Sequence, residues 1–435
     1  MNAAAMNIYI HIPFCHRKCH YCYYYSFVPG KRTVVDEYLS ALEREFFLRN
    51  KKTNLRSLGP VDTVYIGGGT PNYLSDAQLD RLFLILNTYL DLTTVKESVV
   101  ELNPAACSRS QLEILKKHGI TRLSFGIQTV NADILEAINR HHVPDPENII
   151  RTASGMGFVV NLDFMLGLPG QTMDDVEKAI RLVKELKPES SFWCELRCGT
   201  EQIGAFSNIP SHEEVVAMYE LVTQELALSG YRQIIPEYFT TKRSMPLYLE
   251  TWWTARRSLG FGLSAFSASG DVFSKNTDSL TEYVATLGRG ERPLRYVYRL
   301  DREEMALVRL VSALKEGRAD LGRIRRESGV DLEKKLEREL SAAVLAGLIT
   351  LKKGKLAFTE RGFTISSPVA NGLLRNSDYL VRIMDTAFNF IDTMPDLESF
   401  IRRHFVIRDE GDETSVVFVS PNGNGVGILK TYAKE

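Results

Sequence analysis

Three cysteines lie within eight residues near the start of the chain, in the segment YIHIPFCHRKCHYCYYYSF. Cys15, Cys19 and Cys22 offer three thiolates that can bind three irons of a [4Fe–4S] cube and leave the fourth iron without a protein ligand. In zinc proteins, an open coordination position distinguishes a catalytic site from a closed structural one, and we apply the same reasoning to iron. The spacing therefore predicts a catalytic iron–sulfur cluster.

Other uses of these thiols are alternatives. A disulfide framework is disfavoured, because six cysteines in 435 residues is sparse and we expect no signal peptide before them. Zinc would need a fourth ligand, and His16 or His20 would have to supply it from within a tight loop. Cys107, Cys194 and Cys198 lie on separate expected elements, where a cysteine is usually a small buried residue.

The cysteine segment resembles that of the radical S-adenosylmethionine (SAM) enzymes. The matching branch contains oxygen-independent coproporphyrinogen III oxidase, a related heme chaperone and the class C radical SAM methyltransferases. The resemblance runs from Tyr9 to Ser367, and further blocks follow in the family's order: IGGGTP at 66–71, ELNP at 101–104, RLSFGIQ at 122–128, NLDFMLGLPGQT at 161–172 and LGFGLSAFS at 259–267. It implies a [4Fe–4S] cluster, SAM as cofactor, and reductive cleavage of SAM to a 5′-deoxyadenosyl radical.

Composition is that of an ordinary globular enzyme, with 44% hydrophobic and 25% charged residues. A formal net charge of −1 gives no attraction for nucleic acid or anionic lipid. The chain has no apolar run of the ~18 residues that a membrane span needs. We expect a cytoplasmic monomer without nucleic-acid or membrane partners. Radical SAM chemistry further implies a small-molecule substrate and an external electron donor such as flavodoxin or ferredoxin.

Strand and helix patterns alternate over the first two thirds of the chain. Short apolar runs predict strands near 7–12, 61–66, 97–102, 121–127, 158–165, 190–196 and 232–236. Between them lie helical patterns, one of which begins at a capping box of Ser75 and Gln78. This order predicts an α/β fold with a parallel sheet and right-handed crossovers. The family resemblance also implies an incomplete (β/α)6-type barrel, with its site at the carboxyl ends of the strands.

Three domains are expected: a radical SAM barrel at 1–293, a winged-helix-like domain at 294–367 and an extra helix and hairpin segment at 368–435. The second begins with the amphipathic helix REEMALVRLVSALKEG and ends in a hairpin that turns at Lys353-Gly354. Its helix LEKKLERELSAAVLAG is mixed in charge, which favours a lid over the substrate rather than a nucleic-acid reader. In the third, NSDYLVRIMDTAFNFIDTM has helical spacing and VVFVSPNGNGVGIL predicts a hairpin with an Asn-Gly turn.

A glycine-rich segment follows the strand VDTVYI directly. Gly68, Gly69 and Thr70 lie in it, where glycines let the backbone approach a ligand closely and offer carbonyls to an ammonium group. The segment is not a dinucleotide-binding motif, because it lacks the G-x-G-x-x-G spacing. We expect it to bind the methionine part of SAM. The alternative is a tight turn after the strand.

Four polar residues on or beside expected strands match the positions of the family's SAM ligands. Glu101 and Gln128 end expected strands, and Arg140, on an expected helix over 131–140, could clamp a carboxylate. Asp163 interrupts an otherwise apolar strand, where a buried acid is costly unless it binds something. The alternative for these charged residues is a structural ion-pair network.

The resemblance assigns further residues to the same site. Tyr9 matches the aromatic residue beside the sulfonium and is a catalytic candidate, and Tyr21 matches a residue whose backbone touches adenine. Arg197 falls where the family makes a backbone contact to adenine. Glu195 and Glu237 lie near strand ends and are candidate proton shuttles.

Departures from the family bear on the reaction. Coproporphyrinogen oxidases have a long N-terminal arm and a fourth cysteine two residues beyond the third, where this chain has Tyr24. Heme chaperones share a tryptophan matched by Trp253, but their heme-binding His-Asn pair corresponds here to Tyr248-Leu249. A histidine is a common heme ligand, so this change weighs against heme delivery.

The third group holds two SAM molecules, one of which donates a methyl or methylene carbon. Its second-SAM region corresponds to YLETWWTARRSLGFGLSAFSASG, with Leu247, Tyr248 and Phe266 at the matching pocket positions. Methyl or methylene transfer to an unsaturated or aromatic metabolite is therefore our first expectation. An oxidase-like reaction on a tetrapyrrole is second, and heme delivery without catalysis is third.

Overall fold

The computed structural model describes residues 6–140, 146–196, 201–249, 257–315, 317–359, 405–410, 413–419 and 426–433. The chain forms two compact units, Met1–Arg299 and Leu300–Glu435. The expected boundary at 293 lies before that division, because residues 294–299 form a strand of the first unit's sheet. The expected division at 368 stays a prediction, since residues 360–404 lie outside the described residues.

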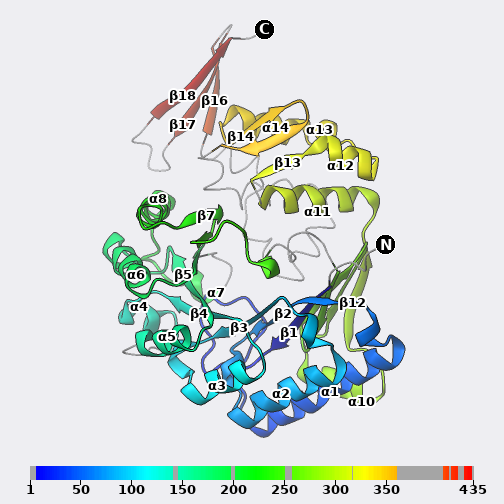
Figure 1. The fold of residues 1–435 in the computed structure, drawn as a ribbon. Helices are drawn as coiled ribbons and strands as arrows, with labels where there is room; N and C mark the ends of the chain where they lie inside the picture. The colour runs from blue at the N-terminus through cyan, green and yellow to red at the C-terminus, as the bar shows by residue number, and fades with distance from the viewer. Residues whose placement is uncertain are drawn as a thin grey trace. The chain divides into compact units, whose positions relative to one another are not determined.

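Six parallel strands form the centre of the first unit and pair in chain order. They are β1 (Met6–Ile12), β2 (Val61–Gly68), β3 (Glu97–Leu102), β4 (Arg122–Gln128), β5 (Val159–Leu166) and β6 (Ser190–Glu195). Figure 1 shows that this sheet is curved and that helices cover its outer side. The predicted incomplete (β/α) barrel is confirmed.

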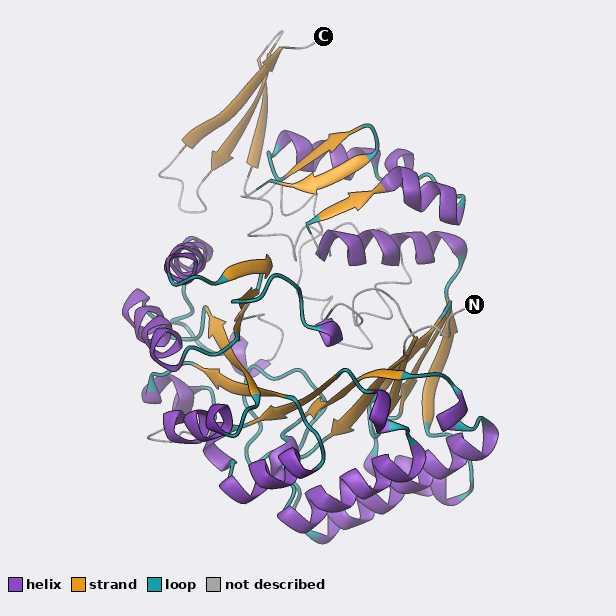
Figure 2. Ribbon diagram, in the orientation of Figure 1, coloured by secondary structure: helices purple, strands orange, loops and turns teal. Residues whose placement is uncertain are grey.

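The helices of this unit follow the predicted alternation, as Figure 2 shows. Those that follow β1 to β6 are α1 (Thr33–Lys52), α2 (Asp76–Tyr89), α3 (Arg109–Lys117), α4 (Ala132–Ala137), α5 (Pro146–Gly155), α6 (Met173–Leu186), α7 (Glu201–Gly204) and α8 (His212–Leu228). Ser75 and Gln78 form the predicted capping box at the start of α2. The helix expected over 131–140 is wrong at its end: α4 stops at Ala137, so Arg140 lies in the loop beyond it.

Further strands extend the sheet at both edges. They are β7 (Arg232–Ile235), β8 (Tyr238–Thr240), β9 (Arg257–Phe261), β10 (Phe266–Ser269), β11 (Val272–Asn276) and β12 (Leu294–Arg299), with α10 (Leu280–Gly288) before the last. Strand β9 is parallel to β1, whereas β8 is antiparallel to both β6 and β7. The run near 232–236 is therefore no further barrel repeat, because a tight turn into β8 can join only antiparallel strands.

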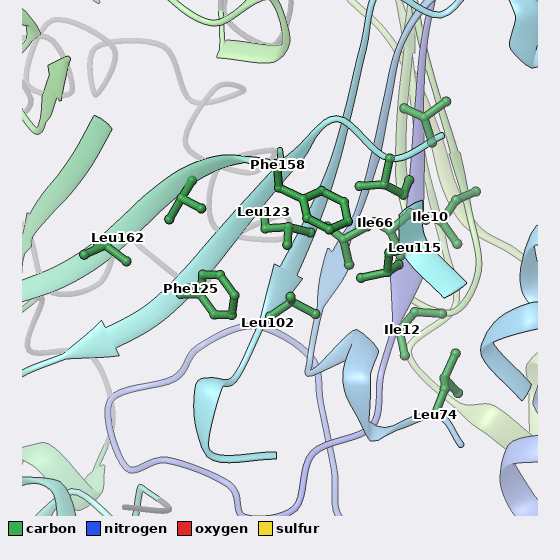
Figure 3. Close-up of a cluster of buried hydrophobic side chains, with 14 of the residues drawn as sticks. Ile10, Ile12, Ile66, Leu74, Leu102, Leu115, Leu123, Phe125, Phe158 and Leu162 are labelled. Carbon is green, nitrogen blue, oxygen red and sulfur yellow. The ribbon is translucent and has the colours of Figure 1, made fainter. Parts of the chain in front are cut away.

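Alternation along the parallel strands separates a dry face from a polar one. Ile8, Ile10 and Ile12 of β1 are buried in the apolar core, which Figure 3 shows for neighbouring strands and helices. Burying each such side chain contributes roughly 1.5–3 kcal/mol. The intervening residues of β1, Asn7 and Tyr9, line a small pocket, which Ile8 also borders. The strand pattern thus gives the barrel an apolar exterior under the helices and a polar interior.

Between residues 300 and 359, the described part of the second unit forms four helices and a small sheet. They are α11 (Arg302–Lys315), α12 (Leu321–Ser328), α13 (Leu332–Lys335), α14 (Glu337–Leu345), β13 (Arg318–Asp320), β14 (Ile349–Lys352) and β15 (Lys355–Phe358). The predicted hairpin β14–β15 turns at Lys353-Gly354, where both residues have positive φ, as a two-residue type I′ turn requires. Strand β13, which we did not predict, pairs with β15 and completes a three-stranded wing.

The end of the chain holds an antiparallel sheet of β16 (Phe405–Glu410), β17 (Glu413–Val419) and β18 (Val426–Ala433). Strands β17 and β18 are the arms of the predicted hairpin, and β16 is an additional strand. The helical pattern at 376–394 and the Asn-Gly turn lie outside the described residues.

Candidate active site

The three cysteines lie on one loop that leaves the carboxyl end of β1. The Cys15 amide donates to the Phe27 carbonyl at 3.0 Å, and the Phe27 amide donates to the Pro13 carbonyl at 2.9 Å. Within the loop, the Cys22 amide donates to the Cys19 carbonyl at 3.1 Å. Backbone bonds therefore close the loop at its base and hold all three thiols at the end of the barrel where the site is expected.

The residues after α4 brace the cysteine loop from the other side. The His20 amide donates to the Ile138 carbonyl at 3.0 Å, and Asn139 Nδ2 donates to the Lys18 carbonyl at 3.0 Å. Asn139 has a φ of +55°, a conformation that asparagine tolerates better than most residues. A segment more than a hundred positions away in sequence thus sets the shape of the loop.

Arg140 ends this bracing segment and lies beside the thiols. Its Nη1 donates to the Tyr21 hydroxyl at 3.0 Å and lies 3.8 Å from Cys19 Sγ, while Nη2 donates to the Gly126 carbonyl. Burial raises the pKa of the Cys15 thiol, so its ligation requires that the metal displace a proton.

The donor set fits a cluster better than a single ion. Within the described ranges, no three His, Cys, Asp or Glu side chains gather as ligands of one metal ion. In a cube each thiolate binds a different iron, so the thiols need not meet at one point. The two histidines that could complete a zinc site have other contacts: His16 packs on the Tyr73 ring at 4.7 Å, and His20 Nδ1 lies 3.2 Å from the Ala137 carbonyl.

The glycine segment is packed against the cysteine loop and a buried acid. The Gly69 amide donates to the Ile12 carbonyl at 2.7 Å, and the Thr70 hydroxyl lies 3.5 Å from Cys15 Sγ. A Cβ at residue 67 would lie 2.6 Å from Glu101 Oε2, and Gly68 has a φ of +106°. Close packing against the protein's own atoms therefore already requires these glycines, and their contact with SAM stays a prediction.

Glu101 and Asp163 are both held by neutral donors. Glu101 accepts from the Tyr65 hydroxyl at 2.5 Å and from the Gly68 amide at 3.1 Å. Burial raises the pKa of Glu101, and it raises that of Asp163 to about 7, with repulsion from Glu101 adding to the effect. Hydroxyl, amide and backbone groups, rather than lysine or arginine, are the hydrogen-bond partners of both carboxylates in the described chain. This differs from the ion-pair network that was the alternative.

His11 is a member of the site that the sequence did not reveal. Its Nε2 donates to the Tyr25 carbonyl at 2.8 Å, so its Nδ1 must accept from the Tyr9 hydroxyl, 2.9 Å away. Burial lowers the pKa of His11 to about 4, which keeps the ring neutral. The signal was available, because His11 follows Tyr9 by two residues and shares its face of the strand.

Three tyrosines, Tyr9, Tyr65 and Tyr248, form a row of ring contacts in the barrel interior. The Tyr9 ring stacks on Tyr65 at 6.1 Å, and Tyr65 lies 5.1 Å from the Tyr248 ring. The small pocket beside them is also bounded by Asn7, Ile8, Thr63 and Ser258. Tyr248, expected at a second SAM, thus belongs to the barrel interior. The backbone amide of its neighbour Leu247 donates a hydrogen bond to Glu97 Oε2 at 3.2 Å.

Four other predicted residues lie on or beside further strands of the sheet. Gln128 ends β4 with a φ of +69°, and Phe266 packs on Phe273 in the β10–β11 hairpin at 5.6 Å. Glu195 is exposed at the end of β6, and the Glu237 carbonyl accepts from the Trp193 amide at 2.7 Å. Contacts with a substrate stay predictions for these four. Arg197 and the tryptophans at 252 and 253 lie outside the described residues.

Comparison with known proteins agrees with this geometry. The sequence profile of the Radical SAM superfamily matches residues 9–183. The heme chaperone HemW of Bacillus subtilis (strain 168) is 33% identical over 311 residues, which cover 68% of this chain and 79% of the chaperone. The chain belongs to the HemN/HemW-like radical SAM family.

Other relatives of this radical SAM protein include coproporphyrinogen oxidases. The oxygen-independent coproporphyrinogen III oxidase of Pseudomonas aeruginosa is 28% identical over 312 residues, which cover 67% of each chain. The structure of coproporphyrinogen III oxidase (HemN) from Escherichia coli aligns with a TM-score of 0.76 at 23% identity, over 85% of this chain and 89% of that one. This structural likeness supports the shared fold.

Family membership carries the cofactors with it: a [4Fe–4S] cluster and SAM. The cysteine loop described above has the donors for the cluster. Among the described residues, no helix is both long and apolar enough to span a membrane. The monomeric state, the cytoplasmic location and the external electron donor stay predictions.

Proposed function

We propose that this radical SAM protein is an enzyme that cleaves SAM reductively and uses the resulting radical on a tetrapyrrole substrate. The observation that supports it most is a pair of partly buried acids inside the barrel, Glu101 near the end of β3 and Asp163 within β5. In the described part of the chain, both carboxylates accept hydrogen bonds from neutral donors. A buried acid is stabilised by an added cation or hydroxyl, and SAM carries an ammonium group and ribose hydroxyls.

The residues of the site divide the work of binding. Cys15, Cys19 and Cys22 would hold three irons, and Arg140 holds Cys19 and Tyr21 in place from the neighbouring loop. Glu101 would accept hydrogen bonds from the ammonium or ribose of SAM. When bound, the cluster and SAM together supply one electron and a 5′-deoxyadenosyl radical that can abstract hydrogen.

The tetrapyrrole assignment draws on the relatives. The two curated relatives described above are named a heme chaperone and a coproporphyrinogen oxidase, and both names refer to tetrapyrrole chemistry. Neither is a methyltransferase, so two-SAM methyl transfer, our first expectation from sequence, becomes the least supported. Its pocket residues also lie on different features, since Tyr248 faces Tyr65 whereas Phe266 packs on Phe273.

Heme delivery is the second candidate, and identity to HemW favours it. Against it stands Tyr248, whose phenol lies among the tyrosines of the barrel interior where the chaperones have their heme-binding pair. The oxidase reading has its own departure, because Tyr24 replaces the fourth cysteine of those enzymes. Catalysis is preferred because the cysteines and both buried acids of a SAM site are present together.

Anaerobic reconstitution followed by product analysis tests the proposal. The protein is incubated with SAM, dithionite and coproporphyrinogen III, and 5′-deoxyadenosine, S-adenosylhomocysteine and porphyrin products are quantified. We expect 5′-deoxyadenosine and loss of the tetrapyrrole without S-adenosylhomocysteine. S-adenosylhomocysteine formed together with 5′-deoxyadenosine would instead indicate methyl transfer. Tight heme uptake with neither product would indicate a chaperone.

A further inference from the structure

A column of buried polar side chains leads through the barrel interior to Asp163. Arg122 Nη1 donates to Ser190 Oγ at 3.3 Å, and Ser190 Oγ donates to Asn161 Oδ1 at 2.8 Å. Asn161 Nδ2 then donates to Asp163 Oδ1 at 2.6 Å and to Ser124 Oγ at 2.8 Å. Ser124 Oγ completes the column by donating to Asp163 Oδ2 at 2.8 Å.

The hydrogen bonds of this column all run in one direction. Arginine can only donate, so Ser190 must accept from it and point its own hydrogen at the Asn161 carbonyl oxygen. That choice leaves the Asn161 amide group to donate, and Ser124, which accepts from it, has its hydrogen free for Asp163. A chain of donors that starts at a permanent cation and ends at a carboxylate favours the ionised acid.

The residues of the column are too deeply buried for water to replace them. Asn161 is 1% exposed, Ser190 0%, Ser124 4% and Arg122 6%. Burial and the charge of Glu101 raise the pKa of Asp163. Hydrogen bonds from Ser124 and Asn161, and the charge of Arg140, lower it. Asp163 is therefore partly ionised near pH 7, and loss of one hydrogen-bond donor would change its ionised fraction.

We propose that Asn161 is a positioning residue for SAM binding, which keeps Asp163 ionised and turned so that it can accept hydrogen bonds from SAM. This inference rests on the proposed function, because it takes SAM as the ligand of Asp163. Asn161 acts through its hydrogen bond to Asp163, and Ser190 and Arg122 act through Asn161. The column also explains why an apolar strand, VVNLDFML, has two polar residues at alternate positions.

The test is the pH dependence of SAM binding by the cluster-loaded protein, measured anaerobically by calorimetry. Asn161→Leu replaces the amide by an apolar side chain of similar size, so the hydrogen bonds to Asp163 and Ser124 are lost. Ser190→Ala removes only the hydroxyl that orients the Asn161 amide. If the pKa of Asp163 rises by about one, the ionised fraction at pH 7 falls about fivefold, and so does the affinity for SAM. Near pH 9 both proteins are ionised, and the affinities should converge. A purely structural defect would weaken binding equally at every pH.

Ser191→Ala is the matched control, because Ser191 is equally buried on the same strand but bonds to Trp193 Nε1 at 3.0 Å. Its SAM affinity should follow that of the wild type at every pH. Infrared titration of the protonated carboxyl band, assigned by its loss in Asp163→Asn, gives a readout that needs no SAM. If the pH midpoint of this titration were the same in the wild type, Asn161→Leu and Ser190→Ala, the inference would be overturned. Failure of the wild type to bind SAM would instead overturn the proposed function.

Discussion

Replacing Glu101 by glutamine should weaken SAM binding while it leaves the stability of the fold nearly unchanged. Glu101 is partly buried, and among the described residues its carboxylate accepts from the Tyr65 hydroxyl and the Gly68 amide. Glutamine has the same shape and can keep one of these bonds, while it removes a charge that burial disfavours, as the raised pKa of Glu101 indicates. We expect the free energy of unfolding of the metal-free protein to change by about 1 kcal/mol or less.

The same change should weaken SAM binding strongly. A hydrogen bond to a charged group contributes about 1.5–3 kcal/mol, so losing the carboxylate that we propose as the partner of the SAM ammonium corresponds to a roughly 10- to 150-fold higher Kd. Calorimetry with SAM on the anaerobically reconstituted protein measures this change, and urea unfolding measures the stability.

Glu97→Gln on the same strand is the matched control. Glu97 lies 3.8 Å from Arg122 Nε and accepts from the Leu247 amide, so it has a cation beside it that Glu101 lacks. Its loss should lower stability by about 1–3 kcal/mol with a smaller effect on the Kd of SAM. If Glu101→Gln bound SAM like the wild type, Glu101 would have no part in the site and our reading of the buried acids would be wrong.

The remaining predictions concern the cluster, pH and the frame of the barrel. Cys19→Ala should abolish the visible absorbance of the reconstituted cluster and all formation of 5′-deoxyadenosine; SAM cleavage at the wild-type rate would refute the ligand assignment. Since the pKa of Asp163 is raised to about 7 from an ordinary 3.8, its contribution to stability is complete below pH 3.8 and is lost as pH rises toward 7. Asp163→Asn should therefore gain stability over the wild type across this window in urea unfolding, and a constant difference would contradict it. Glu45 is 1% exposed and accepts from Arg49 at 3.3 Å, so Glu45→Ala should lower the free energy of unfolding by about 3–5 kcal/mol. Glu43→Ala, on an exposed part of the same helix, should cost under about 1 kcal/mol in the same urea titration, and equal losses would show that burial is not the cause.

Local sequence determined the parts of this protein that depend on neighbouring residues. Apolar runs located the six parallel strands, and the Ser75–Gln78 pair located a helix start, because strand pattern and capping act within a few residues. The three cysteines predicted a cluster for the same reason, since their spacing is itself the ligand arrangement. The direction of β7 was missed, because it depends on the tight turn that pairs it with β8.

Only the tertiary structure decided how the site is held together. Arg140 was expected to clamp a carboxylate, yet folding places it against Tyr21 and Cys19, more than a hundred positions away in the chain. The column behind Asp163 draws on β4, β5 and β6, so no local pattern could predict it. Sequence spacing specifies which groups are available, whereas the pairing of strands brings together donors and acceptors that lie far apart in the chain. The charge and orientation of a buried acid depend on those partners, and therefore on the fold.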